Sequence, residues 1–142
     1  MSNDGNNAKA ALVSELNGLL ADHMALFFKT KNFHWHVAGP RFRDLHLLFD
    51  EQAIEIRDQI DAIGERVRKN DEYTLTSIGS VAKHTQVKDQ DDVTLTADAM
   101  VKRLKAMKEL AEQAGDNATD GLIDDWTDMA EERVWFLNQT LK

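Results

Sequence analysis

The stretch NFHWHVAGPRFRDLHLLFDEQAIEIRDQIDAIGERV, residues 32–67, contains five side chains that can bind a first-row transition metal. They are His34, His46, Asp50, Asp61 and Glu65. At about 100° per residue, the last four fall within about 100° of one another around a single helix. At about 1.5 Å rise per residue, however, Asp50 and Asp61 are about 16 Å apart along the axis, so one ion cannot contact both. Two antiparallel copies of the helix would place one half-site, His46 and Asp50 of one chain, beside the other half-site, Asp61 and Glu65 of the second chain. The spacing therefore predicts a metal site and a two-fold partner.

Within residues 9–70 the only strong helix break is Gly39-Pro40. Glycine commonly follows the end of a helix, and proline is well suited to the start of the next one. The apolar spacing on either side predicts one helix over about residues 9–37 and another over about residues 42–69. The expected core positions of the second helix lie roughly 60° to one side of the metal-binding residues. They are Leu45, Phe49, Ala53, Ile56, Ile60, Ile63 and Val67.

The remainder of the chain predicts further helices. A short helix is expected over about residues 77–84, started by Thr76, and an acidic loop over residues 88–92. Thr96 is a suitable N-cap for a third long helix that ends at Gly115. A fourth is expected over about residues 119–141. Four long helices, with a short one in the connection between the second and the third, predict an all-α four-helix bundle with a crossover.

The chain has 142 residues, 42% of them hydrophobic, which suits one domain with a sizeable core. We expect a flexible polar tail over residues 1–8 and a single domain over residues 9–142. The chain has no cysteine, which excludes zinc–thiolate and iron–sulfur sites and fits a reducing cytoplasm. Its first residues have no secretory signal, and no apolar run is long enough to span a bilayer. We therefore expect a cytoplasmic protein without a membrane partner, and leave association with the nucleoid open.

The metal interpretation has a simpler alternative. Charged residues at i and i+4 commonly form a solvated helix face, and Arg57 and Arg66 are placed to pair with the carboxylates. His34 falls on the apolar side of its helix, where a backbone carbonyl can satisfy a histidine as well as a metal can. No histidine follows a glutamate by three residues. The Glu-x-x-His pair of an intrachain di-iron centre is therefore absent.

The quoted stretch resembles the signature of the Dps family, the mini-ferritins known as DNA-binding proteins from starved cells. The shared pattern is a His-Trp pair, a Gly-Pro break, a phenylalanine, a Leu-His pair followed one turn later by an acidic residue, and Asp-x-x-x-Glu-Arg. In this chain these are His34-Trp35, Gly39-Pro40, Phe42, Leu45-His46, Asp50 and residues 61–66. The similarity extends from about Lys9 to the end of the chain and includes Trp135-Phe136.

The resemblance implies ferritin-like four-helix subunits that assemble from two-fold dimers into a hollow dodecamer. It also implies a two-iron ferroxidase centre at each dimer interface. One subunit would supply His34, His46 and Asp50, and its mate Asp61 and Glu65. Such proteins oxidise Fe(II), preferably with hydrogen peroxide, and store ferric mineral inside the shell, which protects the cell and its DNA from oxidative damage.

Further residues have two interpretations each. Trp35 would lie close to the iron, where the family is thought to use a tryptophan to intercept oxidising equivalents, but an aromatic that fills the interface is an equal alternative. His36 lies about 200° from His34 around the helix, so we do not expect it to be a ligand. Gly64 stands where the family commonly has alanine. The last helix carries an acidic row that is either a solvated face or the lining of a pore for Fe(II). This row is Asp120, Asp124, Asp128 and Glu131.

Three functions are therefore compared. The first is a peroxide-consuming ferroxidase and iron-storage cage. The second is a DNA-compacting structural cage with little use of the ferroxidase reaction. The third is a non-catalytic bundle that binds zinc or another metal, which metal analysis would distinguish from the first.

We predict weak or absent direct DNA binding at neutral pH. The chain has a net charge of −8, so a dodecamer would carry about −96 formal charges and would repel phosphates. The N-terminal tail region offers only Lys9, which Asp4 balances. An electrophoretic mobility-shift assay near physiological salt should leave the DNA free, and a tight complex in that assay would contradict the prediction.

Overall fold

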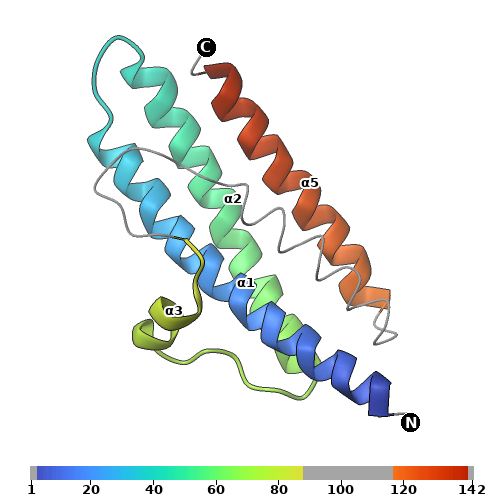
Figure 1. The fold of residues 1–142 in the computed structure, drawn as a ribbon. Helices are drawn as coiled ribbons and strands as arrows, with labels where there is room; N and C mark the ends of the chain where they lie inside the picture. The colour runs from blue at the N-terminus through green and yellow to red at the C-terminus, as the bar shows by residue number, and fades with distance from the viewer. Residues whose placement is uncertain (1–2, 88–116, 141–142) are drawn as a thin grey trace.

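The structure, a computed structural model, describes residues 3–87 and 117–140 of the chain (Figure 1). These residues form three long helices and one short one, and they contain no strand. The helices are α1 (Asn3–His36), α2 (Phe42–Lys69), α3 (Ile78–His84) and α5 (Asn117–Thr140). The predicted loop at residues 88–92 and the predicted third long helix from Thr96 to Gly115 lie outside the described residues.

The two helices that carry the candidate ligands, α1 and α2, form an antiparallel hairpin (Figure 1). On the other side of α2 lies α5, which runs antiparallel to α2, while α3 packs against α1. Arg41, at the start of α2, donates a hydrogen bond to the backbone oxygen of Thr140 in the last turn of α5 (3.3 Å). None of the helices in the described residues is both long enough and apolar enough to cross a bilayer.

The hydrophobic core lies between α1, α2 and α5. From α2 it contains the predicted Ile56, Ile63 and Val67, each at most 1% exposed. Phe49 and Ala53 are buried as predicted, whereas Leu45 and Ile60 are only half-buried. The other members of the core cluster come from α1 and α5. They are Leu12, Val13, Leu16, Leu19, Leu20, Leu26, Ile123, Trp126 and Ala130.

The helix boundaries follow the predictions with two corrections. α2 begins and ends as predicted, at Phe42 and Lys69. α1 begins at Asn3, so residues 3–8, which were expected to form a flexible tail, are helical. The run of alanines near this end favours a helix, and the added turns bury Ala8 in the core. The N-cap of α3 is Ser77 and not the predicted Thr76, because the Ser77 hydroxyl accepts a hydrogen bond from the Ser80 backbone N–H (3.1 Å).

A buried carboxylate anchors the chain after α3. Asp22 of α1 is 1% exposed. One of its oxygens accepts hydrogen bonds from the Thr85 hydroxyl (2.9 Å) and the Gln86 backbone N–H (2.7 Å). These bonds tie the segment after the short helix to the middle of α1.

A buried polar cluster lies where α1, α2 and α5 meet. His23 is fully buried; its Nδ1 lies 2.9 Å from the Leu19 backbone oxygen and its Nε2 lies 2.9 Å from the Gln59 side-chain oxygen. The buried Arg133 of α5 forms an ion pair with Glu55 of α2. Burial, with a smaller effect of the Arg133 charge, lowers the pKa of His23 from 6.5 to about 4, because desolvation disfavours the charged imidazole. His23 is therefore neutral at pH 7.

Gly39, in the connection between α1 and α2, has a φ of 102°, in the region that disfavours L side chains. The following Pro40 restricts its backbone further. We predict that Gly39→Ala lowers the free energy of unfolding by about 1–2 kcal/mol. No described atom lies within 4 Å of the added Cβ, so this cost comes from the backbone alone. Chemical denaturation monitored by circular dichroism measures it.

Gly121→Ala is the matched control, because Gly121 lies within α5 and an added Cβ there meets no described atom within 4 Å. Alanine should stabilise this helix by about 1 kcal/mol relative to glycine. Stabilisation by Gly39→Ala as well would contradict the assigned backbone conformation of Gly39.

We also predict that His23 makes the protein lose stability below pH 6.5. Its pKa is about 4 in the folded chain and 6.5 in the unfolded chain, so between these values the unfolded chain binds an extra proton. This contribution is fully present above pH 6.5. It should fall by up to about 3 kcal/mol as the pH drops towards 4. Urea titrations across this range, at fixed protein concentration, measure the slope.

A His23→Gln variant should lose this part of the pH dependence, whatever its stability at pH 7. His36→Gln, which replaces an exposed histidine of the same helix, should keep it. Equal slopes in the wild type and in His23→Gln would show that the buried imidazole does not titrate as assigned.

Candidate metal centre

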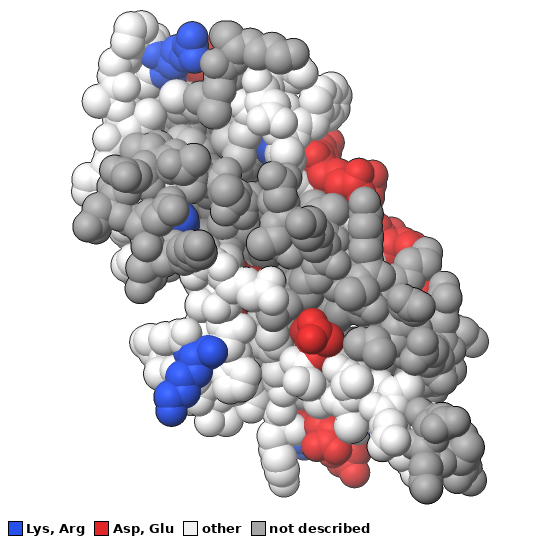
Figure 2. All heavy atoms as spheres, viewed as in Figure 1, with Lys and Arg blue, Asp and Glu red and all other residues white. Residues whose placement is uncertain are grey.

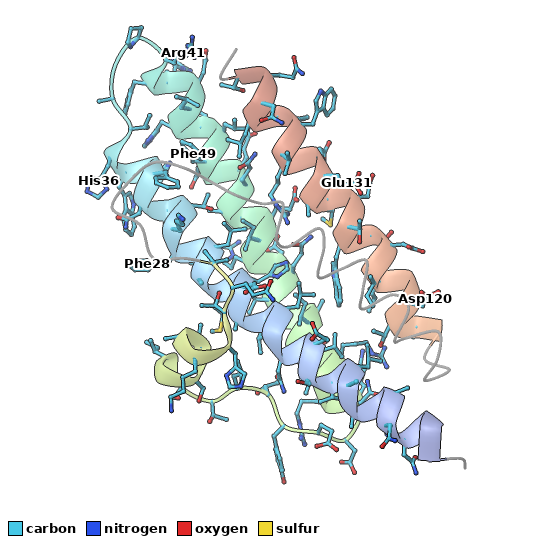
Figure 3. All side chains as sticks on the ribbon, in the orientation of Figure 1. Phe28, His36, Arg41, Phe49, Asp120 and Glu131 are labelled. Carbon is cyan, nitrogen blue, oxygen red and sulfur yellow. The ribbon has the colours of Figure 1, made fainter. Side chains whose placement is uncertain are left out.

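Two reciprocal hydrogen bonds between histidines join the end of α1 to the start of α2. Nδ1 of His34 lies 2.7 Å from the backbone oxygen of His46, and Nδ1 of His46 lies 2.7 Å from the backbone oxygen of His34. The two rings stack, with centroids 3.9 Å apart and planes inclined by 16°. His36 and Arg41, labelled in Figure 3, mark the end of α1 and the residue before the start of α2. His34 is in the last turn of α1, where a backbone carbonyl has no hydrogen-bond partner within the helix. The imidazole of His46 supplies that partner to the carbonyl of His34.

These bonds determine where the imidazole hydrogens are. A carbonyl oxygen can only accept a hydrogen bond, so each Nδ1 carries a hydrogen and each neutral ring keeps its lone pair at Nε2. Metal-binding histidines typically have this arrangement, with one ring N–H on a carbonyl and the other nitrogen available to the ion. The simpler alternative was that a backbone carbonyl accepts the hydrogen bond of His34. This is so for Nδ1, and Nε2 can still bind a metal ion.

Asp50 lies beside this histidine pair. Its Oδ1 is 3.8 Å from Nε2 of His34 and 3.2 Å from Nζ of Lys31. The side chain of His34 is 13% exposed and that of Asp50 is 39% exposed, so the group lies at a partly buried surface. The structure thus brings three of the five predicted ligands, namely His34, His46 and Asp50, together at one end of the hairpin.

The other two predicted ligands, Asp61 and Glu65, lie further along α2 and are exposed. Neither carboxylate takes an ion pair or hydrogen bond from the part of the chain that the structure describes. Within residues 3–87 and 117–140, no group of three or more metal-binding side chains is arranged to hold an ion. In a single chain the candidate site is therefore in two separated halves.

In the simpler alternative, Arg57 and Arg66 pair with the candidate carboxylates of α2. The described residues do not contain these ion pairs. Arg57 pairs with its neighbour Asp58, with 3.3 Å between nitrogen and oxygen. Asp50 pairs with Lys31 of the other helix and with no described arginine. The candidate carboxylates of α2 are therefore not taken up by the arginines of the same helix in the described residues.

Exposed apolar side chains accompany both half-sites. On α2, Leu47 and Ile54 are 47% and 42% exposed, and they lie within about 40° of Asp61 and Glu65 around the helix. On α1 the exposed apolar residues fall within about 40° of one another and include the residue next to His34. They are Met24, Phe28 and Trp35.

The remaining candidates near the pair are arranged as follows. Trp35 is 56% exposed, which suits either of its two interpretations. His36 is exposed, and its Nδ1 lies 2.8 Å from the Asn32 backbone oxygen of its own helix, so it takes no part in the pair. The ring of Phe42 stacks on His46, with 5.0 Å between centroids.

The acidic row of α5 is on a different face of the molecule. In Figure 2 the acidic side chains gather along the edge formed by α5. Asp124, Asp128 and Glu131 are exposed and Asp120 is half-buried. Asp120 and Glu131, labelled in Figure 3, lie along the side of α5 away from α2. The row is therefore not part of the histidine site.

Sequence reasoning missed Lys31 and Phe42 as neighbours of the site. Lys31 precedes His34 by three residues and Phe42 precedes His46 by four, so each shares a helix side with its histidine. That spacing was a usable signal. The contact of Lys31 with Asp50, on the other helix, was not accessible without the structure.

Comparisons with known proteins agree with this architecture. Residues 13–142 match the family model described as Ferritin, ferritin-like domain. A curated relative, DNA protection during starvation protein 2 of Bacillus anthracis, is 33% identical to the chain over 143 residues, covering 90% of the chain and 97% of the relative.

Two solved structures are similar over almost their whole length. The Dps protein of Thermosynechococcus elongatus superposes with a TM-score of 0.91 at 26% identity, covering 97% of this chain and 94% of that one. The Dps protein of Vibrio cholerae O1, described as a member of a broad superfamily of ferritin-like diiron-carboxylate proteins, has a TM-score of 0.88 at 27% identity. Its alignment covers 96% of this chain and 92% of that one.

Proposed function

The chain belongs to the Dps family of ferritin-like proteins, with the all-α four-helix fold of that family, and we propose that it is an iron-oxidising and iron-storing cage. In this proposal it oxidises Fe(II), preferably with hydrogen peroxide, at centres shared between two subunits. The ferric product is stored inside a hollow dodecamer. By removing Fe(II) and peroxide together, the protein protects the cell and its DNA.

The observation that carries the proposal is the paired orientation of His34 and His46. Both rings are held by carbonyls at Nδ1, so both have Nε2 available, and Asp50 lies next to one of them. Two imidazoles with carboxylates, and without thiolates, suit Fe(II) and leave coordination positions for water or peroxide. The hydrogen bonds at Nδ1 restrain both imidazoles before an ion arrives, which would lower the cost of binding.

The second half of the centre comes from a partner chain in this proposal. Asp61 and Glu65 are about 16 Å or more from Asp50 along α2, and they are exposed. The face that carries them also exposes Leu47 and Ile54. Apolar side chains that recur along one exposed face are typical of an interface. In a two-fold dimer the same face meets itself, so antiparallel α2 helices would complete two equivalent centres.

The chemistry follows from this donor set. Each of two Fe(II) ions gives up one electron, and hydrogen peroxide takes both electrons and two protons as its O–O bond breaks to form two water molecules. Asp50, Asp61 and Glu65 would favour the ferric product, because anionic oxygen ligands stabilise the higher charge. Delivery of two electrons together avoids the release of a hydroxyl radical.

Other residues have supporting roles in the proposal. Trp35 lies next to His34 in sequence and would either intercept oxidising equivalents or fill the interface. The acidic row of α5, from Asp120 to Glu131, would concentrate Fe(II) at a pore of the cage. With a net charge of −8 per chain, the protein would protect DNA without direct contact, because the cage would repel the phosphates. The alternative of a DNA-compacting cage is for this reason less well supported.

We predict that His46→Ala and Asp61→Ala each slow peroxide-dependent Fe(II) oxidation at least about tenfold, because each removes a ligand from a different half of the centre. Stopped-flow absorbance of the ferric product measures the rate. Hydrogen peroxide should also react faster than oxygen at equal concentration.

Asp125→Ala is the matched control, because it removes an exposed carboxylate from α5, remote from the centre. It should oxidise Fe(II) as the wild type does. Unchanged rates in both His46→Ala and Asp61→Ala would eliminate the proposed centre. A native mass that corresponds to a monomer would eliminate the shared site.

A further inference from the structure

The buried His23 makes two contacts that a neutral imidazole cannot satisfy together. Its Nδ1 lies 2.9 Å from the backbone oxygen of Leu19, and its Nε2 lies 2.9 Å from Oε1 of Gln59. Both oxygens can only accept a hydrogen bond, whereas a neutral imidazole carries a single N–H. The backbone oxygen of Leu19 cannot turn away, so the one hydrogen belongs on Nδ1. The lone pair of Nε2 then faces a lone pair of the Gln59 oxygen.

The side-chain amide of Gln59 can remove this conflict. A half-turn about its last bond exchanges Oε1 and Nε2, so that the amide N–H donates to Nε2 of His23. In the present orientation the amide nitrogen lies 2.8 Å from Sδ of Met129, and Oε1 lies 3.4 Å from Nη1 of Arg133. A thioether is a weak acceptor and 3.4 Å is a long hydrogen bond. The half-turn therefore exchanges two weak contacts for one of ordinary length.

The charges in this cluster balance only while His23 is neutral. Arg133 of α5 is buried and pairs with Glu55 of α2, so these two charges cancel. A proton on His23 would add a second cation to the bundle interior. Burial, with a smaller effect of the Arg133 charge, lowers the pKa of His23 from 6.5 to about 4. The neutral ring is thus the form present at pH 7, and its Nε2 needs a donor.

Titratable groups on the neighbouring turns do not compensate a charge on His23. On α1, the carboxylate of Asp22 accepts hydrogen bonds from the segment after α3. Asp58 of α2 and Glu132 of α5 are exposed. The titratable side chains of α3 are exposed as well; they are Lys83 and His84. Among the residues that the structure describes, the ion pair of α2 and α5 is therefore the charge that the imidazole meets.

We infer that His23 and Gln59 form a proton-operated switch, in which the amide donates to the neutral imidazole and turns over to accept from the imidazolium in acid. This inference does not depend on the proposed iron centre. The amide orientation in the structure is the one that the imidazolium requires. In that form one oxygen of α2 accepts from His23 of α1 and from Arg133 of α5. In the neutral form Gln59 binds His23 and releases Arg133 to Glu55 alone. Proton uptake by one buried ring thus changes the contacts among three helices.

The hydrogens of the wild-type protein test the inference directly. Side-chain ¹⁵N chemical shifts of the assembled, ¹⁵N-labelled protein distinguish an imidazole nitrogen with a hydrogen from one without. The His23 signals are identified by their loss in His23→Gln. At pH 7 we expect a hydrogen on Nδ1 and none on Nε2, with magnetisation transfer from the Gln59 amide to Nε2. A hydrogen on Nε2 at this pH would overturn the switch, because the amide would then have no reason to turn.

Gln59→Glu should reverse the pH dependence that His23 gives to stability. The new carboxylate can only accept, and with Glu55 it balances the charges of Arg133 and an imidazolium. It should therefore raise the pKa of His23 in the folded chain above the 6.5 of the unfolded chain. The stabilisation from His23 is then fully present below pH 6.5 and is lost as the pH rises, which is opposite to the wild type. Urea titrations of the assembled protein measure the sign.

Two further variants complete the test. Gln139→Glu makes the same change at an exposed position of α5 and should keep the wild-type pH dependence. Gln59→Leu offers neither a donor nor an acceptor, so it should keep a bare Nε2 at pH 7 and lose the transfer from the amide. If Gln59→Glu keeps the wild-type sign, the inference is wrong. If Gln59→Glu does not assemble, the ¹⁵N spectra of the wild type and Gln59→Leu decide between the two amide orientations.

Discussion

The site depends on the reciprocal exchange of hydrogen bonds between His34 and His46. Each imidazole donates from Nδ1 to the other residue's carbonyl, which closes the α1–α2 hairpin at the end where the chain reverses. The same two bonds leave both Nε2 lone pairs available for an ion. One local arrangement therefore stabilises the turn between two long helices and orients the two candidate nitrogen ligands of the proposed centre. Asp50, one turn after His46, adds the nearest carboxylate.

The rest of the fold separates the ligand face of α2 from its core face. Ile56, Ile63 and Val67 point into the bundle and are almost completely buried. Asp61 and Glu65 are exposed on another side of the same helix. Because α2 runs for 28 residues without a break, its two half-sites cannot approach each other within one chain. In the proposed centre, a second copy of this helix would supply the missing half of each site.

The bundle interior also contains a buried polar cluster around His23. A neutral histidine, a glutamine and an arginine–glutamate pair occupy the space between α1, α2 and α5. The chain lacks the Glu-x-x-His pair on which an intrachain di-iron centre relies. In this protein the polar groups of the bundle interior bind one another, and the candidate iron site lies at a partly buried surface.

Much of this could be predicted from the sequence, and what could not be predicted has physical reasons. The 3.6-residue period and the Gly39-Pro40 break gave both ends of α2 correctly. The start of α1 was wrong because a polar composition hid alanines that favour a helix. Spacing also predicted that His46 and Asp50 share one side of their helix. It could not reveal the orientation of the imidazoles or the contact of Lys31 with Asp50, since both depend on how α1 packs against α2.

The measurement that tests the shared centre most directly is complementation between two inactive variants. His46→Ala and Asp61→Ala chains are unfolded, mixed in equal amounts and reassembled, and peroxide-dependent Fe(II) oxidation is measured. In a two-fold dimer of one chain of each kind, both substitutions fall in one centre and the other centre is intact. Random pairing should therefore restore about a quarter of the wild-type activity. Activity no higher than that of the two variants reassembled separately would contradict a centre built from two chains.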